Sequence, residues 1–235
     1  MKRLVFLMTI AVIGFLGCEN REKQPMIMES KTTTVSTGQV AAQAPGTAQP
    51  QVLQKQDIKA QGDFQPFLVY RDKASKDNHY VPSGFMPDGK CLTVQDTWLE
   101  NCHSGKSCIK IVYDVECSKQ GAKWAGIFWQ NPANNWGSRK GGFDLTGATR
   151  LTFWAKGDKG EERIEEFKMG GIGGDYPDTD SAMIGPVVLT PEWQQYTIDL
   201  RGKDLSYISG GFSWAANVDV NQEACVFYLD DIQYE

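Results

Sequence analysis

The chain has 235 residues, of which 41% are apolar and 23% are charged, and its formal net charge is −5. These values are typical of a globular protein with one or two domains and exclude a wholly disordered chain. The acidic balance argues against a nucleic-acid partner, because neutralising phosphates requires an excess of basic residues. The aromatic residues are unevenly distributed: none lies between Phe15 and Phe64, and all seven tryptophans lie between Trp98 and Trp214.

The first seventeen residues have the form of an export signal. Lys2 and Arg3 precede an apolar run that is short for a membrane span and ends at Gly17 and Cys18. This ending resembles the bacterial lipoprotein signal, in which cleavage before the cysteine is coupled to its lipidation. The sequence therefore predicts a lipoprotein signal peptide over residues 1–17 and a bilayer anchor of palmitate-type acyl chains on Cys18. The alternative is an ordinary signal peptide followed by a chance cysteine.

The residue after Cys18 is Glu19. In lipoproteins of this type an aspartate at that place favours retention in the inner membrane. Because this chain has Glu19 there instead, the resemblance implies an exported protein anchored in the cell envelope, at the outer membrane. Residues 18–62 are rich in Gln, Ala and Thr and contain no aromatic residue. Such a segment buries too little apolar surface to offset its chain entropy, which predicts a flexible tether.

Residues 63–235 predict one all-β domain. Short β-branched and aromatic runs alternate here with Gly, Asn, Asp and Pro clusters, and no long helical pattern occurs. This pattern is typical of a two-sheet antiparallel sandwich or barrel. The expected strands cover residues 67–70, 108–115, 124–130, 150–155, 163–169, 195–200, 209–215 and 226–234.

Alternation along these strands predicts which side chains are buried. Phe153 and Phe167 fall on apolar faces, whereas Trp154, Glu166 and Lys168 fall on polar ones. An indole on a polar sheet face can stack on the C–H face of a sugar, with nearby charged groups to bind its hydroxyls. The alternative is a tryptophan covered by a loop.

Three C-terminal segments resemble galactose-binding-domain-like jelly rolls, which include many carbohydrate-binding modules and the complex I intermediate-associated proteins. These segments are Leu151–Gly157 after Gly147-Ala148-Thr149, the Thr-Pro-Glu-Trp run from Thr190 to Leu200, and Phe227–Ile232. The resemblance implies a two-sheet jelly roll over residues 63–235 that binds polysaccharide or envelope glycan without catalysis. It is weak evidence for one ligand, because this fold serves many functions.

The resemblance also implies candidate sites. One structural Ca²⁺ is common in this group, and hard oxygen donors for it would be Asp231, Asp230, Asp72 and Asn78. Sugar binds the concave sheet face or the loops at one edge in such modules. The candidate ligand-binding residues are therefore Trp154, Glu166 and Lys168 on a face and Asn135 and Trp136 in a loop, with Trp129 as a further candidate. Trp129, Trp124 and Trp214 could each be a sugar platform or part of the core, and the core is the favoured place.

Five cysteines remain beside Cys18. Cys102 and Cys108 flank a short turn, and a disulfide between them would close it. The resemblance places the closing strand beside the strand from Cys108, which implies a second disulfide between Cys117 and Cys225 and leaves Cys91 free. Zinc is not expected, since the sequence has no C-x-x-C and only two histidines.

Signatures of the common enzyme classes are absent, so the chain is not expected to be an enzyme. A glycoside hydrolase or lyase remains an alternative, because it needs only two carboxyl groups, such as Glu166 with Asp175 or Asp199. A structural or assembly lipoprotein that binds a protein partner is the other alternative.

Overall fold

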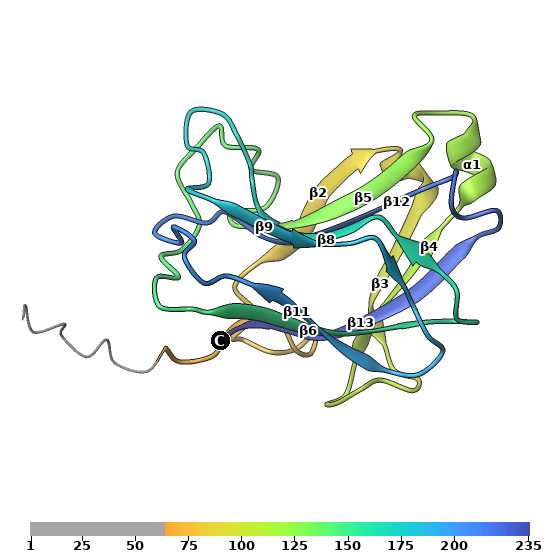
Figure 1. Ribbon diagram of the computed structural model, residues 1–235, viewed down its shortest axis with the longest axis horizontal. Coiled ribbons are helices and arrows are strands. Elements are labelled where there is room, and N and C mark those ends of the chain that lie inside the picture. Colours follow the sequence, from red (N-terminus) through yellow and green to blue (C-terminus); the bar gives the residue numbers. More distant parts are fainter. Residues whose placement is uncertain (1–63) are drawn as a thin grey trace, which may run out of the picture. The chain divides into compact units, whose positions relative to one another are not determined.

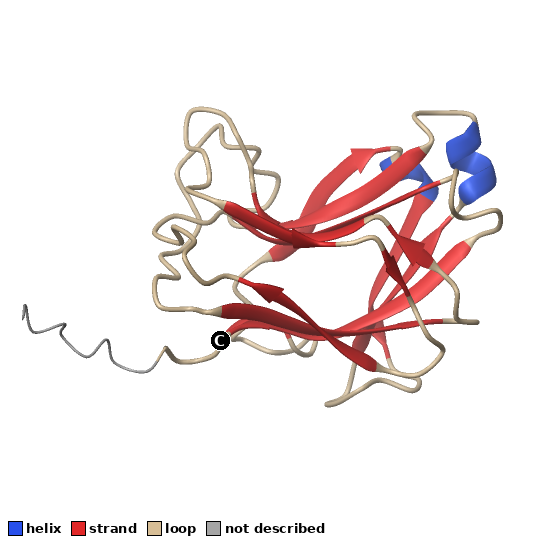
Figure 2. Ribbon diagram, viewed as in Figure 1, coloured by secondary structure: helices blue, strands red, loops and turns tan. Residues whose placement is uncertain are grey.

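The structure of the protein is a computed structural model that describes residues 64–235. The predicted signal peptide, Cys18 and the predicted tether lie outside the described residues. Within the described part, two antiparallel sheets pack face to face (Figure 1), and helix is confined to two short segments, η1 (Gly89–Cys91) and α1 (Val115–Lys119) (Figure 2). The predicted all-β sandwich is therefore confirmed.

The six-stranded sheet has the order β11-β6-β13-β4-β3, with β1 paired to the far end of β13. Its strands are β1 (Phe67–Tyr70), β3 (Leu92–Trp98), β4 (Cys108–Tyr113), β6 (Arg150–Gly157), β11 (Gln194–Asp199) and β13 (Cys225–Tyr234).

The five-stranded sheet has the order β2-β5-β12-β8-β9. It is built from β2 (Val81–Pro87), β5 (Trp124–Gln130), β8 (Glu166–Gly170), β9 (Ser181–Ile184) and β12 (Gly210–Asn217). A small ribbon of β7 (Arg163–Ile164) and β10 (Val187–Val188) completes the strands of the described region. The chain crosses between the two sheets repeatedly, as in a jelly roll.

The core lies between the sheets. Alternation puts every second side chain of each strand into this layer. The largest fully buried side chains are aromatic: Trp129, Trp214, Tyr113, Tyr234, Phe153, Phe167, Phe212 and Phe227. Phe153 from one sheet contacts Phe167 and Phe212 from the other, with ring centroids 4.6 and 5.1 Å apart. The expected burial of Phe153 and Phe167 is confirmed.

The disulfides differ in part from the expectation. Cys102–Cys108 forms as predicted, but Cys117 bonds to Cys91, and Cys225 is a free, buried thiol. The predicted Cys117–Cys225 pair is wrong because the chain leaves β4 and enters α1 before it reaches Cys117. The Asp114 N–H donates to the Cys91 carbonyl at the start of this helix, which brings Cys117 to η1 instead of β13.

No helix between residues 64 and 235 combines the length and the hydropathy that crossing a membrane would require.

Candidate functional site

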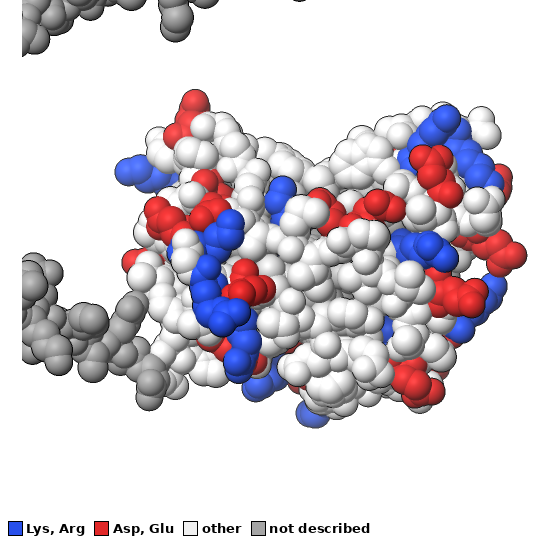
Figure 3. Space-filling view, in the orientation of Figure 1, with Lys and Arg blue, Asp and Glu red and all other residues white. Residues whose placement is uncertain are grey.

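The outer face of the five-stranded sheet forms a groove. Along its middle the floor carries the small residues Gly126, Ser213 and Ala215, with the Met86 side chain of β2 lying over Gly126 and Phe128 filling the end below Trp136. Gly126 is required there, since a Cβ would lie 2.3 Å from the Trp214 carbonyl oxygen. In Figure 3 the upper surface, above this sheet, is hollowed between two raised parts. A low floor between higher ends suits an elongated ligand.

Each end of the groove carries an exposed indole. Trp124 begins β5 and is 39% exposed, and Trp136 is 45% exposed in the loop that follows β5. The Trp136 ring meets Phe128 edge-on at 5.9 Å between centroids. Because Trp124 and Phe128 are four residues apart on one strand, the two ends are separated by about 13 Å. This span is longer than a single sugar ring.

The loop that presents Trp136 is fixed by Asn135. Its side chain is fully buried, and its Oδ1 accepts hydrogen bonds from the N–H groups of Gly137 and Arg139. Its Nδ2 donates to the Arg139 carbonyl, and Gln130 Nε2 donates to the Asn135 carbonyl. Asn135 therefore positions Trp136 and does not contact a ligand itself, which corrects the expected ligand-binding role.

Glu166 and Lys168 lie side by side on the groove face of β8. Glu166 pairs with Ala215 and Lys168 with Ser213 across the floor, and both side chains are half-buried. Within residues 64–235 neither side chain has a hydrogen-bonding or ionic partner. Around the Trp124 end, Glu166, Met183 and Asp219 help to line a pocket of about 570 Å³. The groove therefore offers a free carboxylate and a free ammonium group between two indoles.

Trp154 lies on the opposite side of the molecule. It belongs to β6 of the six-stranded sheet and points outward, as alternation predicts, but this face is not shared with Glu166 and Lys168. The His103 ring stacks on it, with centroids 3.7 Å apart and planes inclined by 16°. The loop between β3 and β4 thus covers Trp154, which is the alternative that the sequence left open.

The other tryptophans divide between core and groove. Trp129 and Trp214 are fully buried, which places both in the core and removes Trp129 from the candidate binding residues. Trp124 was expected in the core and instead stands at the groove end. Its position as the first residue of β5, next to the turn at Gly121, explains this exposure, because the partner strand ends opposite it at Asn217.

The expected calcium donors are engaged with protein groups. The Asp72 carboxylate accepts from the N–H groups of Lys106 and Ser107, and Asn78 bonds the backbone of residues 71 and 72. Asp231 contacts His103 at 3.0 Å. The carboxylates of Asp72, Asp230 and Asp231 do not gather into one group, so this set does not fit a Ca²⁺ ion, and Ca²⁺ stays a prediction without support from these contacts.

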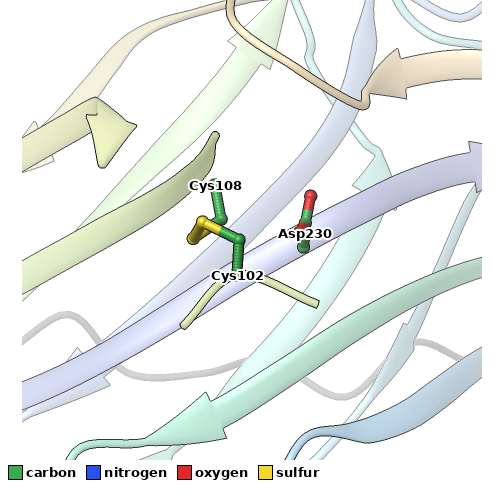
Figure 4. Close-up of side chains that lie close together, drawn as sticks. All are labelled: Cys102, Cys108 and Asp230. Carbon is green, nitrogen blue, oxygen red and sulfur yellow. A yellow bond between two sulfur atoms is a disulfide. The ribbon is translucent and has the colours of Figure 1, made fainter. Parts of the chain in front are cut away.

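Asp230 lies beside the Cys102–Cys108 disulfide (Figure 4). This trio is not a metal site, because disulfide sulfurs lack the thiolate charge that binds metals. Asp230 is fully buried and accepts from the N–H groups of Ser104 and Asp231. Burial raises the pKa of its carboxyl to about 7, against the two hydrogen bonds that lower it.

The carboxyl pairs considered for hydrolysis are not brought together. Asp199 lies on β11 of the six-stranded sheet, where it pairs with Arg201, and so faces away from Glu166. Asp175 lies in the loop after β8, where the N–H of the next residue, Tyr176, donates to the Gly137 carbonyl at the Trp136 end, and the strand separates that end from Glu166 by about 13 Å. Glycosidases hold their carboxyl groups about 5–10 Å apart.

No protein-family model matches the chain. A comparison with curated proteins finds no match either. Among solved structures, the chain is similar to a family 30 carbohydrate-binding module, with 15% identity over 72% of this chain and 87% of that module and a TM-score of 0.49. It is similar to the family 11 carbohydrate-binding module of a cellulosomal cellulase of Clostridium thermocellum, with 15% identity over 66% of this chain and 87% of the module and a TM-score of 0.43.

A variant of a family 29 carbohydrate-binding module is similar at 10% identity over 73% of this chain and 91% of the module, with a TM-score of 0.41. These structures are of the class that the sequence resembles. At such identities and TM-scores they carry no argument about a ligand, and the fold class rests on the strand pairing itself.

Proposed function

We propose that this protein is a non-catalytic binding protein whose groove on the five-stranded sheet holds a polysaccharide or an envelope glycan. The observation that carries the proposal is the pair of exposed indoles, Trp124 and Trp136, at the two ends of a groove with a small-residue floor. Indole faces stack on the C–H faces of sugar rings, and two of them favour an extended chain over a monosaccharide.

Glu166 and Lys168 supply the polar half of this recognition. Sugar hydroxyls both donate and accept hydrogen bonds, so a free carboxylate beside a free ammonium group matches them in either direction. Hydrogen bonds to charged groups are stronger than those between neutral groups. Contacts with both groups would fix the position of the bound polysaccharide along the groove, which stacking on the indoles alone does not.

Affinity electrophoresis of the intact protein in gels that contain neutral polysaccharides tests this proposal. We expect retardation by at least one neutral glycan, and loss of that retardation in Trp136→Ala and Trp124→Ala. Trp154→Phe is the matched control, because it removes an indole from the opposite sheet and keeps an aromatic ring under His103. Retardation that depends on Trp154 and not on the groove would contradict the proposal.

The absence of catalysis is part of the proposal. The support for it is that Glu166 is separated from Asp175 and Asp199, as described above. Incubation of the protein with each retarding glycan should release no reducing ends or unsaturated products. Product release that Glu166→Gln abolishes would favour a hydrolase or lyase instead.

We further propose that acyl chains on Cys18 anchor the protein in the cell envelope, at the outer membrane. The sequence supports this through the basic start, the short apolar run and the cysteine at its end. Metabolic labelling with a palmitate analogue should mark the wild-type protein and leave Cys18→Ala unlabelled. A labelled Cys18→Ala variant, or an unlabelled wild type, would contradict the anchor.

A further inference from the structure

A row of lysines and aromatic rings crosses the outer face of the six-stranded sheet, on the side opposite the groove. Its members, in order across the strands, are Trp98, Lys110, Tyr228, Lys156 and Trp193. The register places Tyr228 directly opposite both Lys110 and Lys156. Gln194 of β11 pairs with Ala155 of β6, and the strands are antiparallel, so Trp193 lies opposite Lys156. We call this set the lysine row.

Each ammonium group of the lysine row lies against aromatic rings. Lys110 Nζ is 4.0 Å from the Trp98 ring centroid and 5.7 Å from that of Tyr228. Lys156 Nζ is 4.8 Å from the Tyr228 centroid and 5.4 Å from that of Trp193. Cation–π contacts of this kind hold an ammonium group in place and leave its N–H groups free to donate.

The rings are themselves fixed by hydrogen bonds. Trp98 Nε1 donates to the Glu100 carbonyl, and Trp193 Nε1 donates to the Asn101 carbonyl at the same distance of 2.9 Å. The Tyr228 hydroxyl donates to Asp158 at 2.8 Å. The row is therefore built in advance of any ligand, which lowers the entropy that binding would cost.

Neither lysine of the row has a carboxylate partner within residues 64–235. Lys110 and Lys156 stand on β4 and β6, two strand spacings apart, which is about 10 Å. We propose that the lysine row binds an acidic polysaccharide, a chain of sugars that carry carboxylates at intervals. One carboxylate would accept from each ammonium group, and the chain would pass from one half-buried lysine to the other across Tyr228, whose ring is itself buried between them.

The charges around the row favour this ligand over a denser polyanion. Asp158 accepts from the Tyr228 hydroxyl, Glu100 follows Trp98 by two residues and accepts from its Nε1 through the backbone carbonyl, and the whole chain is acidic at −5. These carboxylates repel closely spaced phosphates, such as those of nucleic acid or an anionic membrane surface. A chain whose charges are spaced several ångströms apart can meet the two lysines and pass the acidic groups.

The test is binding of the intact protein to polygalacturonate at low ionic strength, with methyl-esterified polygalacturonate as the uncharged counterpart. We expect the wild type to bind the acid form and to lose that binding as salt is added. Lys110→Gln/Lys156→Gln should bind about 10- to 100-fold more weakly, since two charge-assisted hydrogen bonds are removed. Lys110→Arg/Lys156→Arg keeps both charges and should restore most of the binding.

Two control variants separate the row from other sources of binding. Lys119→Gln/Lys203→Gln removes the same charge from lysines that are already paired with Glu116 and Asp180, and should bind as the wild type does. Trp124→Ala/Trp136→Ala disables the groove, and the loss of polygalacturonate binding caused by Lys110→Gln/Lys156→Gln should be the same in this background as in the wild type. Failure of the groove proposal therefore leaves this one standing, and the reverse also holds.

Four results would overturn the inference. These are absence of polygalacturonate binding by the wild type, equal binding by the Lys110→Gln/Lys156→Gln variant, equal losses in the control pair of lysines, and tighter binding to phosphatidylglycerol vesicles than to polygalacturonate. The last result would assign the row to a membrane surface.

Discussion

Asn135 stabilises the loop that carries Trp136. Its buried amide holds three backbone groups of the loop that carries Trp136. We expect Asn135→Ala to lower the free energy of unfolding by about 1–3 kcal/mol, because buried donors and acceptors lose their partner. The same variant should bind glycan more weakly, since Trp136 is no longer fixed.

Chemical denaturation measures the first effect and affinity electrophoresis measures the second. Ser138→Ala is a suitable control, because this exposed residue lies in the same loop. Asn135→Ala with unchanged stability and unchanged retardation would show that the loop does not depend on the amide.

Asp230 predicts a pH dependence of stability. Its carboxyl has a pKa of about 7 in the folded protein, against an ordinary value of 3.8. Between these two pH values the unfolded chain has released the proton and the folded chain retains it, so stability falls as pH rises. The loss corresponds to about 1.4 kcal/mol for each pKa unit and is complete above pH 7.

In the Asp230→Asn variant the side chain at position 230 is uncharged at every pH. The stability of this variant should therefore change less between pH 5 and pH 8 than that of the wild type. Thermal unfolding across this range provides the measurement. The asparagine amide can accept only one of the two backbone hydrogen bonds of Asp230, which lowers the stability of the variant at every pH. The comparison therefore uses the slope of stability against pH within each protein. Equal slopes in the two proteins would mean that Asp230 does not titrate in this window.

At the scale of elements, the Cys91–Cys117 disulfide joins η1 to α1 over a sequence separation of 26 residues. A loop of this length implies about 3 kcal/mol of stabilisation through a restricted unfolded chain. We expect Cys91→Ala/Cys117→Ala to lose about that amount in denaturant titrations. A loss confined to Cys117→Ala/Cys225→Ala, with Cys91→Ala harmless, would instead support the pairing of Cys117 with Cys225.

The free thiol of Cys225 gives an independent check. Burial raises the pKa of this thiol to about 12, so it should react with alkylating reagents only after the protein unfolds. Peptide mapping after alkylation in denaturant, without reduction, should mark Cys225 alone among the five cysteines of residues 64–235.

Strands with a regular apolar pattern could be predicted from the sequence, the edge strand β11 among them, whereas the edge strands β2, β3 and β9 were not. The run at 67–70 and the run at 124–130 coincide with β1 and β5, whose burial sets the pattern. β2 was missed because Val81–Pro87 contains two prolines and a glycine, which an edge strand tolerates. β3 was missed as well, although Leu92–Trp98 alternates between half-buried and exposed residues.

At the scale of the whole molecule, alternation indicates that a side chain leaves the core but not which sheet carries it. Trp154 and Glu166 both lie on polar faces, yet β6 and β8 belong to different sheets. Whether these two side chains share a face depends on the strand order, and the strand order is set by pairing between strands that are distant in sequence. Trp136 and Lys168 could be selected from sequence, whereas Trp124 could be assigned to the groove only after its end of β5 was seen to be open.

The groove and the lysine row occupy opposite faces of the sandwich, so one domain carries two surfaces of different chemistry. We propose neutral sugar rings as ligands of the groove and acidic ones as ligands of the lysine row. Each face can be disabled without touching the other.

The most direct test of glycan binding in the groove is isothermal titration of the intact protein with an oligosaccharide of the glycan that retards it most. We expect Trp124→Ala/Trp136→Ala to bind about 10- to 100-fold more weakly than the wild type, since each stacking contact contributes about 0.5–1.5 kcal/mol beyond its buried area. The affinity of Trp154→Phe should equal that of the wild type. Unchanged affinity in the double variant, or a loss in Trp154→Phe alone, would contradict binding in the groove.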